Sequence, residues 1–135
     1  MDPGLASENS KQPPKAPGMR YRHYAPKADL TLVEGTMEEV ISKINALTRE
    51  AQAMGKSVGV LATEENKDCY VADHVIVIGQ RQDEAEIARH LFDVLRQFDH
   101  LQVDLIYSES FVAAGVGQAI MNRLLKAAGH KRIFV

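Results

Sequence analysis

Arginine, histidine and tyrosine side chains are concentrated in Arg20–Tyr24, which holds two arginines, one histidine and two tyrosines. Guanidinium groups bind phosphate or carboxylate oxygens through paired N–H donors, and tyrosine rings stack against apolar walls. Prolines at positions 17 and 26 flank the stretch and favour extended backbone around it. We therefore interpret Met19–Tyr24, the basic segment, as a candidate contact for an anionic ligand.

Alternation along an extended chain would divide the basic segment into two faces. Arg20, Arg22 and Tyr24 would lie on one face, and Tyr21 and His23 on the other. A short, basic, proline-bounded stretch is also typical of a solvated leader, and residue types alone favour that simpler interpretation.

The start of a helix at Gly115 and Gly117 is a second candidate anion site, because free backbone N–H groups there can hold a phosphate. The dinucleotide-binding fingerprint requires a small residue three positions after Gly117, where this chain has Ile120. It also requires a tight turn after the strand, whereas seven residues separate Tyr107 from Gly115. Ordinary helix capping is therefore the favoured interpretation.

Other polar residues give weaker signals. On the same helix, we expect Asn122 to hydrogen-bond a nearby loop and Arg123 to pair with an acid or reach another domain. Residues 108–110 (Ser-Glu-Ser) follow a strand at the edge where open α/β sheets place ligands, but they lack a third group to form a nucleophile and base. The histidine spacing indicates neither a triad nor a metal site.

Charge and proline content divide the 135-residue chain into two parts. Residues 1–28 contain all five prolines and five Lys and Arg against two acidic residues, a net charge of +3. The remainder carries eleven basic and sixteen acidic residues, a net charge of −5. We predict a leader or linker at 1–28 and a folded domain at 29–135. The acidic domain argues against a nucleic-acid surface there, since phosphate contacts need clustered Lys and Arg.

Export signals are not apparent. Cys69 is the only cysteine, so an intrachain disulfide is impossible, and a reducing cytoplasm is the expected location. The first ten residues lack the basic and apolar regions of a signal peptide, and no apolar run reaches the length of a membrane span. We expect no membrane partner.

Hydrophobic periodicity predicts strands alternating with helices. Thr36 and Glu39 form a helix-start signal, and Gly55 a stop. The pattern is typical of a three-layer α/β sandwich with a mostly parallel sheet, preceded by an extended, proline-rich basic leader. We predict strands at 29–33, 57–62, 74–79, 103–107 and 131–135, helices at 36–54, 81–98 and 115–128, and a loop at 63–70. The apolar run at 74–79 is predicted to be buried on both faces.

Two motifs resemble one known family. Residues 16–28 (APGMRYRHYAPKA) resemble the linker between the domains of the two-domain threonylcarbamoyl-AMP synthases. Residues 115–128 (GVGQAIMNRLLKAA) resemble a helix of that family's C-terminal domain. With the element order between them, the resemblance covers roughly residues 13–135, and it implies a small Rossmann-like domain.

The resemblance also implies a function for a longer parent protein. That protein would form threonylcarbamoyl-adenylate and pyrophosphate from L-threonine, bicarbonate and ATP, with Mg²⁺, for tRNA modification. The catalytic residues would belong to an N-terminal domain that this chain lacks, and the chain would be an inactive piece of the enzyme. The chain would meet ATP, L-threonine and bicarbonate through that domain, and tRNA only indirectly. Residues 17–26, with Met19, Arg20, Tyr21, Arg22, His23 and Tyr24, would act as a lid over its cleft.

Two other classes of function remain open. The chain could be an independent nucleotide- or RNA-binding module, which would bind ATP or tRNA by itself. It could also be a docking or regulatory domain that only positions the linker. In the second case, a linker peptide would restore much of the activity of the bare catalytic domain.

Overall fold

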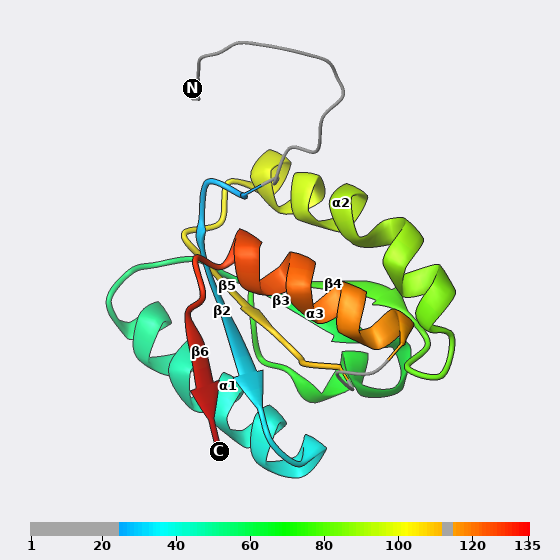
Figure 1. The fold of residues 1–135 in the computed structure, drawn as a ribbon. Helices are drawn as coiled ribbons and strands as arrows, with labels where there is room; N and C mark the ends of the chain where they lie inside the picture. Colours follow the sequence, from blue (N-terminus) through cyan, green and yellow to red (C-terminus); the bar gives the residue numbers. More distant parts are fainter. Residues whose placement is uncertain (1–24, 112–114) are drawn as a thin grey trace, which may run out of the picture.

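The computed structural model of the protein describes residues 25–111 and 115–135, which form an α/β domain with five strands and three α-helices (Figure 1). The strands alternate with the α-helices along the chain, except where a short 3-10 helix, η1, connects β3 to β4. The elements are β2 (Asp29–Glu34), α1 (Met37–Ala53), β3 (Val58–Thr63), η1 (Glu64–Cys69), β4 (His74–Gly79), α2 (Glu84–Leu101), β5 (Leu105–Ser108), α3 (Val116–Ala127) and β6 (Arg132–Phe134).

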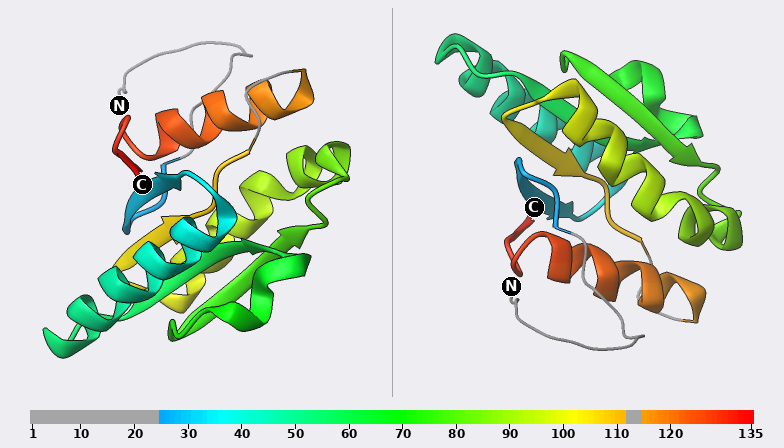
Figure 2. Two further views of the ribbon diagram at one scale, coloured as in Figure 1. Left: turned by 90° about the horizontal axis from the view of Figure 1, so that it is seen from below. Right: turned by 90° about the horizontal axis from the view of Figure 1, so that it is seen from above.

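All neighbouring strands pair in parallel, in the order β4-β3-β5-β2-β6. Helix α1 covers one face of the sheet, and α2 and α3 cover the other (Figure 2). The strands therefore share one amino edge and one carboxyl edge. The predicted three-layer, Rossmann-like α/β sandwich with a parallel sheet is confirmed.

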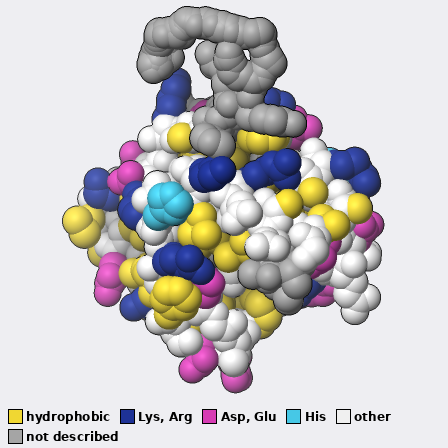
Figure 3. Space-filling model, viewed as in Figure 1, with side chains coloured by type: hydrophobic (Ala, Val, Ile, Leu, Met, Phe, Trp, Pro, Cys, Tyr) yellow, Lys and Arg dark blue, Asp and Glu magenta, His cyan; other side chains and the backbone are white. Residues whose placement is uncertain are grey.

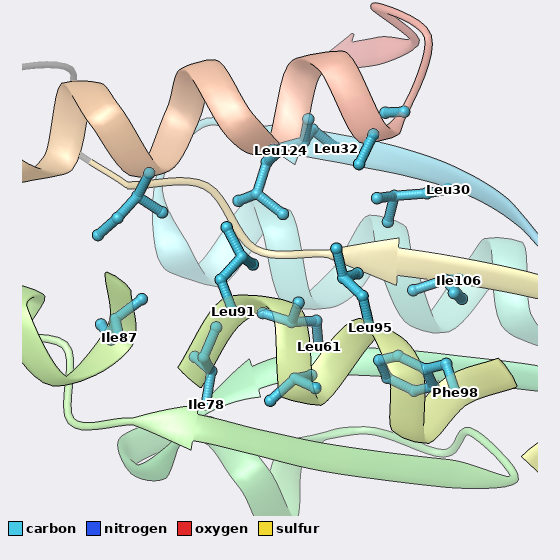
Figure 4. Packing of buried hydrophobic residues seen from close by; sticks show 14 of the residues in the cluster. Leu30, Leu32, Leu61, Ile78, Ile87, Leu91, Leu95, Phe98, Ile106 and Leu124 are labelled. Carbon is cyan, nitrogen blue, oxygen red and sulfur yellow. The ribbon is translucent and has the colours of Figure 1, made fainter. Parts of the chain in front are cut away.

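The larger part of the core lies between the sheet and the helices α2 and α3 (Figure 4). Leu91, Leu95 and Phe98 of α2 meet Leu61 and Ile106 of the sheet, all 1% exposed or less. Their 3- and 4-residue spacing places the three α2 side chains on one face of the helix. A second cluster, including Val40 and Ile44 of α1, fills the opposite face. Burial on both faces explains why all six residues of β3 are buried.

Local signals set the helix ends. Thr36 is the N-cap of α1, and its hydroxyl oxygen accepts a hydrogen bond from the Glu39 backbone N–H at 3.3 Å. Gly55 follows the helix with a φ of +80°, a conformation that glycine adopts without strain. The signals at Thr36 and Gly55 mark the ends of this helix.

Three sequence predictions need correction. The run at 74–79 is a strand, but β4 is at the sheet edge and only Ile78 is fully buried. Residues 64–69, predicted as loop, form η1. Helix α2 begins at Glu84 rather than position 81, because Asp83 is the residue whose side chain caps the first turn, at 3.1 Å from the Glu86 backbone nitrogen.

Candidate functional site

A buried carboxylate, Glu109, lies at the carboxyl edge of the sheet, immediately after β5. Its side chain is fully buried and forms an ion pair with Arg81, whose Nη2 is 2.5 Å from Oε1. The Thr63 hydroxyl donates to Oε1 at 2.9 Å, and the Tyr70 hydroxyl donates to Oε2 at 2.6 Å. The Asn66 side-chain nitrogen lies 3.4 Å from both oxygens. We call these five residues the Glu109 cluster.

The parallel sheet explains how these residues meet. Thr63 ends β3, Asn66 and Tyr70 come from η1 and the residue after it, and Arg81 follows β4. The carboxyl ends of neighbouring parallel strands lie at one edge, so loops that are far apart in sequence converge there. The end of β3, the η1 connection and the loop after β4 are thus tied to a single side chain.

Arg81 is held on several sides. Its Nη1 donates to the Ser110 carbonyl oxygen at 2.9 Å, and its guanidinium carbon lies 5.1 Å from the Phe111 ring centroid. Its backbone N–H donates to the Glu65 carboxylate at 3.1 Å, which lowers the pKa of Glu65. The Nε atom is buried without a hydrogen-bond partner among the described residues.

The electrostatics favour a fixed structure over acid–base chemistry. Burial, followed by the hydrogen bond to Glu109, raises the pKa of Tyr70 far above its ordinary value, so its hydroxyl stays protonated. Both Glu109 oxygens already accept hydrogen bonds from neighbouring side chains of the domain. A buried carboxylate paired in this way joins loops together and is a poor general base.

A hollow of about 510 Å³ lies beside the carboxyl end of β4, lined in part by Glu64, Glu86 and His90. In residues 25–111 and 115–135, no cluster of three or more His, Cys, Asp or Glu side chains could hold a metal ion.

The chain enters the domain at the opposite, amino edge. Pro26 is buried, and the Lys27 backbone N–H donates to Oδ1 of Asp99, in the last turn of α2, at 2.9 Å. A hollow of about 340 Å³ lies between residues 27–28, the end of α2 and residues 102–104. Residues 26 and 27 therefore lie at the amino edge of the sheet, whereas the Glu109 cluster lies at the carboxyl edge.

Comparison with known proteins identifies the family. The family model for the C-terminal domain of threonylcarbamoyl-AMP synthase matches residues 2–129, nearly the whole chain, including the basic segment. The chain belongs to this family.

Curated relatives named threonylcarbamoyl-AMP synthase are considerably longer. The Bacillus subtilis protein is 48% identical over 98% of this chain, which covers 37% of that protein. The Pyrococcus abyssi protein is 45% identical over 90% of this chain, which covers 34% of it. The chain thus spans about a third of the curated relatives that it matches.

Solved structures agree with the fold. The crystal structure of P. abyssi Sua5 complexed with L-threonine matches 98% of this chain with a TM-score of 0.74 and 42% identity, and the chain covers 37% of it. The C-terminal Sua5 domain from Pyrococcus horikoshii matches 82% of this chain, with a TM-score of 0.66 and 37% identity. This chain covers the whole length of that structure. The P. horikoshii domain therefore forms a structural unit by itself.

The predicted lid residues Met19–Tyr24 lie outside the described residues, so their role stays a prediction. The predicted secondary site on the family-like helix can be placed. Gly115 precedes α3 with a φ of +57°, and Gly117 is buried in its first turn. A Cβ atom at Gly115 would meet nothing within 4 Å, so its backbone conformation explains the glycine.

Asn122 and Arg123 are exposed on α3. The expected bonds to a loop and to a neighbouring acid do not form: within the described part of the chain, neither side chain has a hydrogen bond or ion pair. Figure 3 shows Lys and Arg side chains among hydrophobic ones on the face made by α2 and α3. The exposure of Arg123 is compatible with contact to another domain, the other alternative for this residue.

Sequence reasoning noted Glu109 at the right edge but missed its partners. The available signal was an acidic residue directly after an apolar strand, where its burial would demand a cation. Arg81, the second residue after the preceding strand, was the cation to consider. No helix in the described ranges has the length and apolar character needed to span a bilayer.

Proposed function

We propose that this chain is the linker and C-terminal domain of an enzyme that forms threonylcarbamoyl-adenylate and pyrophosphate from L-threonine, bicarbonate and ATP. The observation that carries the proposal is the family match across residues 2–129. The lengths of the relatives support an additional domain in the same protein. The P. abyssi neighbour, named as a complex with L-threonine, supports the substrate class.

Catalysis is assigned to another domain of the longer protein. ATP with Mg²⁺, L-threonine and bicarbonate would bind there, and the product would serve tRNA modification, with tRNA an indirect partner. The paired oxygens of Glu109 support this assignment, since the most deeply buried carboxylate of the present domain is committed to joining loops.

The basic segment would close over the catalytic cleft. Arg20 and Arg22 would neutralise negative charge that develops as pyrophosphate leaves, a stabilisation that is strongest in a site from which water is excluded. Tyr21, His23 and Tyr24 would cover the cleft and limit hydrolysis of the labile intermediate. The folded domain 29–135 would hold the end of this lid.

The test uses the full-length two-domain protein and measures pyrophosphate release that depends on L-threonine and bicarbonate. Arg22→Ala should lower kcat by about 100-fold, because it removes one charge-stabilising group. His23→Ala should also lower kcat. Arg89→Ala, which removes an exposed arginine of α2, is the matched control and should behave as wild type.

Thermal unfolding of all variants should coincide, because the basic segment precedes the folded domain. Wild-type kcat in both Arg22→Ala and His23→Ala would refute the lid.

A further inference from the structure

The acidic charge of the folded domain is unevenly placed along the chain. Residues 29–109 contain seven basic and sixteen acidic residues, whereas residues 110–135 contain four Lys and Arg and no Asp or Glu. The four cations belong to α3, to β6 and to the residue before β6: Arg123, Lys126, Lys131 and Arg132. The net charge of the whole domain, which argued against a nucleic-acid surface, averages over this difference.

The cations of α3 are available to a ligand. Arg123 and Lys126 are exposed and three residues apart, so they are neighbours on the surface of the helix. Neither side chain has an ion pair or a hydrogen bond within the described part of the chain. Lys131 lies 3.1 Å from Asp29, but the two side chains are 47% and 74% exposed. Such exposed pairs are weak, so Lys131 can also meet an anion.

An exposed aromatic ring lies on the edge strand β6, close in the chain to Lys131. Phe134 is 68% exposed, and the guanidinium carbon of Arg132 is 4.9 Å from its ring centroid. Glu34 holds that guanidinium in place, because its carboxylate accepts hydrogen bonds from Nε at 2.5 Å and from Nη2 at 3.0 Å. The ring is therefore supported from the domain while much of it stays open to solvent.

The basic and aromatic groups share one face of the molecule. Figure 3 shows Lys, Arg and His side chains over α3 and β6, next to hydrophobic side chains. Helix α3 leads into β6 through a short turn, so the two elements form one continuous surface. We call the surface made by Arg123, Lys126, Lys131 and Phe134 the α3–β6 surface.

This combination of groups fits a single nucleic-acid strand better than an acidic protein. Cations contact the phosphates of such a strand, and an exposed aromatic ring can stack on an unpaired base, since every base has a π-face. An acidic protein would satisfy the cations, but the negative face of a phenyl ring repels carboxylates. A basic residue near a helix C-terminus, such as Lys126, also stabilises the helix dipole, but that role does not account for Phe134.

We propose that the α3–β6 surface binds single-stranded RNA, with Phe134 stacking on a base and the three cations contacting phosphates. The choice of RNA over DNA rests on the proposed function, whose product would serve tRNA modification. An unpaired segment is required because the bases of a duplex are stacked on one another and cannot reach the ring. This contact is additional to the synthase reaction, in which tRNA takes no direct part.

The experiment titrates the whole 135-residue chain into a fluorescein-labelled oligouridine RNA at several salt concentrations and follows fluorescence anisotropy. Phe134→Leu should weaken binding about tenfold, because it keeps an apolar side chain but removes the π-face. Its salt dependence should match wild type, since no charge is lost. Arg123→Gln combined with Lys126→Gln should weaken binding about tenfold and reduce the slope of log K against log salt by about 1.4.

The matched control is Arg49→Gln combined with Lys56→Gln, which removes the same amount of charge. Arg49 lies in α1, on the other face of the sheet, and Lys56 follows that helix; both are exposed. The control should bind RNA as wild type does. Residues 1–28 are the same in every variant, so their basic side chains cannot cause a difference. Circular dichroism checks that each variant is folded.

Each remaining outcome overturns the proposal. Wild-type affinity in Phe134→Leu or in the α3 double variant shows that the surface does not hold the strand, and equal weakening in the control shows that only overall charge matters. Polyglutamate that binds as tightly as the RNA would assign the surface to acidic proteins. Tighter binding of oligothymidine DNA would reverse the choice of RNA. Pyrophosphate release is not measured here, so the synthase proposal stands or fails separately.

Discussion

At the scale of single residues, the domain depends on one buried ion pair. Glu109 is fully buried, and Arg81 is 28% exposed at its side chain. Bringing such charges out of water is costly, and the cost is offset only when the remaining lone pairs of the carboxylate accept hydrogen bonds. The Thr63 and Tyr70 hydroxyls donate these hydrogen bonds to Glu109. Removing one partner would leave the other charge buried and unpaired.

Glu109→Ala should therefore lower the free energy of unfolding by about 3–5 kcal/mol. Urea titration of this chain, followed by circular dichroism, measures the change. Glu64→Ala is the control: Glu64 pairs with Lys67 on the surface, at 46% exposure, and its loss should cost at most about 1 kcal/mol. Equal losses in the two variants would contradict a structural role for the Glu109 cluster.

At the scale of elements, the packing of α2 on β3 requires a residue without a side chain. A Cβ atom at Gly59 of β3 would lie 2.5 Å from Cε1 of Phe98, closer than real Cβ contacts. Phe98 is 1% exposed and surrounded by core residues, so its ring has little room to move. The close approach of helix and strand therefore depends on Gly59.

Gly59→Ala should destabilise the domain by about 1–3 kcal/mol through overpacking. In a double-mutant cycle, Phe98→Leu should relieve part of this cost, because the smaller side chain vacates the space where the ring lies. The destabilisation of the double variant should be less than the sum of the single variants, as measured by urea unfolding. Strict additivity would show that the two positions do not interact.

At the scale of the whole molecule, the two edges of the sheet have different roles. At the carboxyl edge, the usual ligand edge of such folds, the Glu109 cluster joins the loops that follow β3, β4 and β5. The amino edge receives the linker at Lys27. Six-residue strands separate the edges by about 20 Å, so a catalytic domain beside one edge would leave the other free.

Photo-cross-linking in the full-length protein tests this placement. A benzophenone amino acid at Lys56, exposed just before β3 at the amino edge, should cross-link to the catalytic domain. The matched position is Gln80, exposed just after β4 at the carboxyl edge, and it should give little cross-linking. Mass spectrometry of the products identifies the partner domain, and cross-links from Gln80 but not Lys56 would reverse the predicted placement.

The sequence by itself determined the elements and the motif that names the family. Helix starts and stops, such as Thr36 and Gly55, depend on neighbouring residues, and apolar periodicity reports the local backbone repeat. All five strands were therefore found, with ends displaced by up to two residues. The basic segment was equally visible, because its chemistry is contained in consecutive positions.

Only the tertiary structure decided which elements are neighbours. The run at 74–79 is as apolar as a central strand, yet the order β4-β3-β5-β2-β6 places it at the edge. Arg81 and Tyr70 reach Glu109 from 28 and 39 residues away, and Lys27 meets Asp99 from 72 residues away. Such contacts form because strand order brings distant loops to a common edge, and strand order depends on the packing of all the elements together.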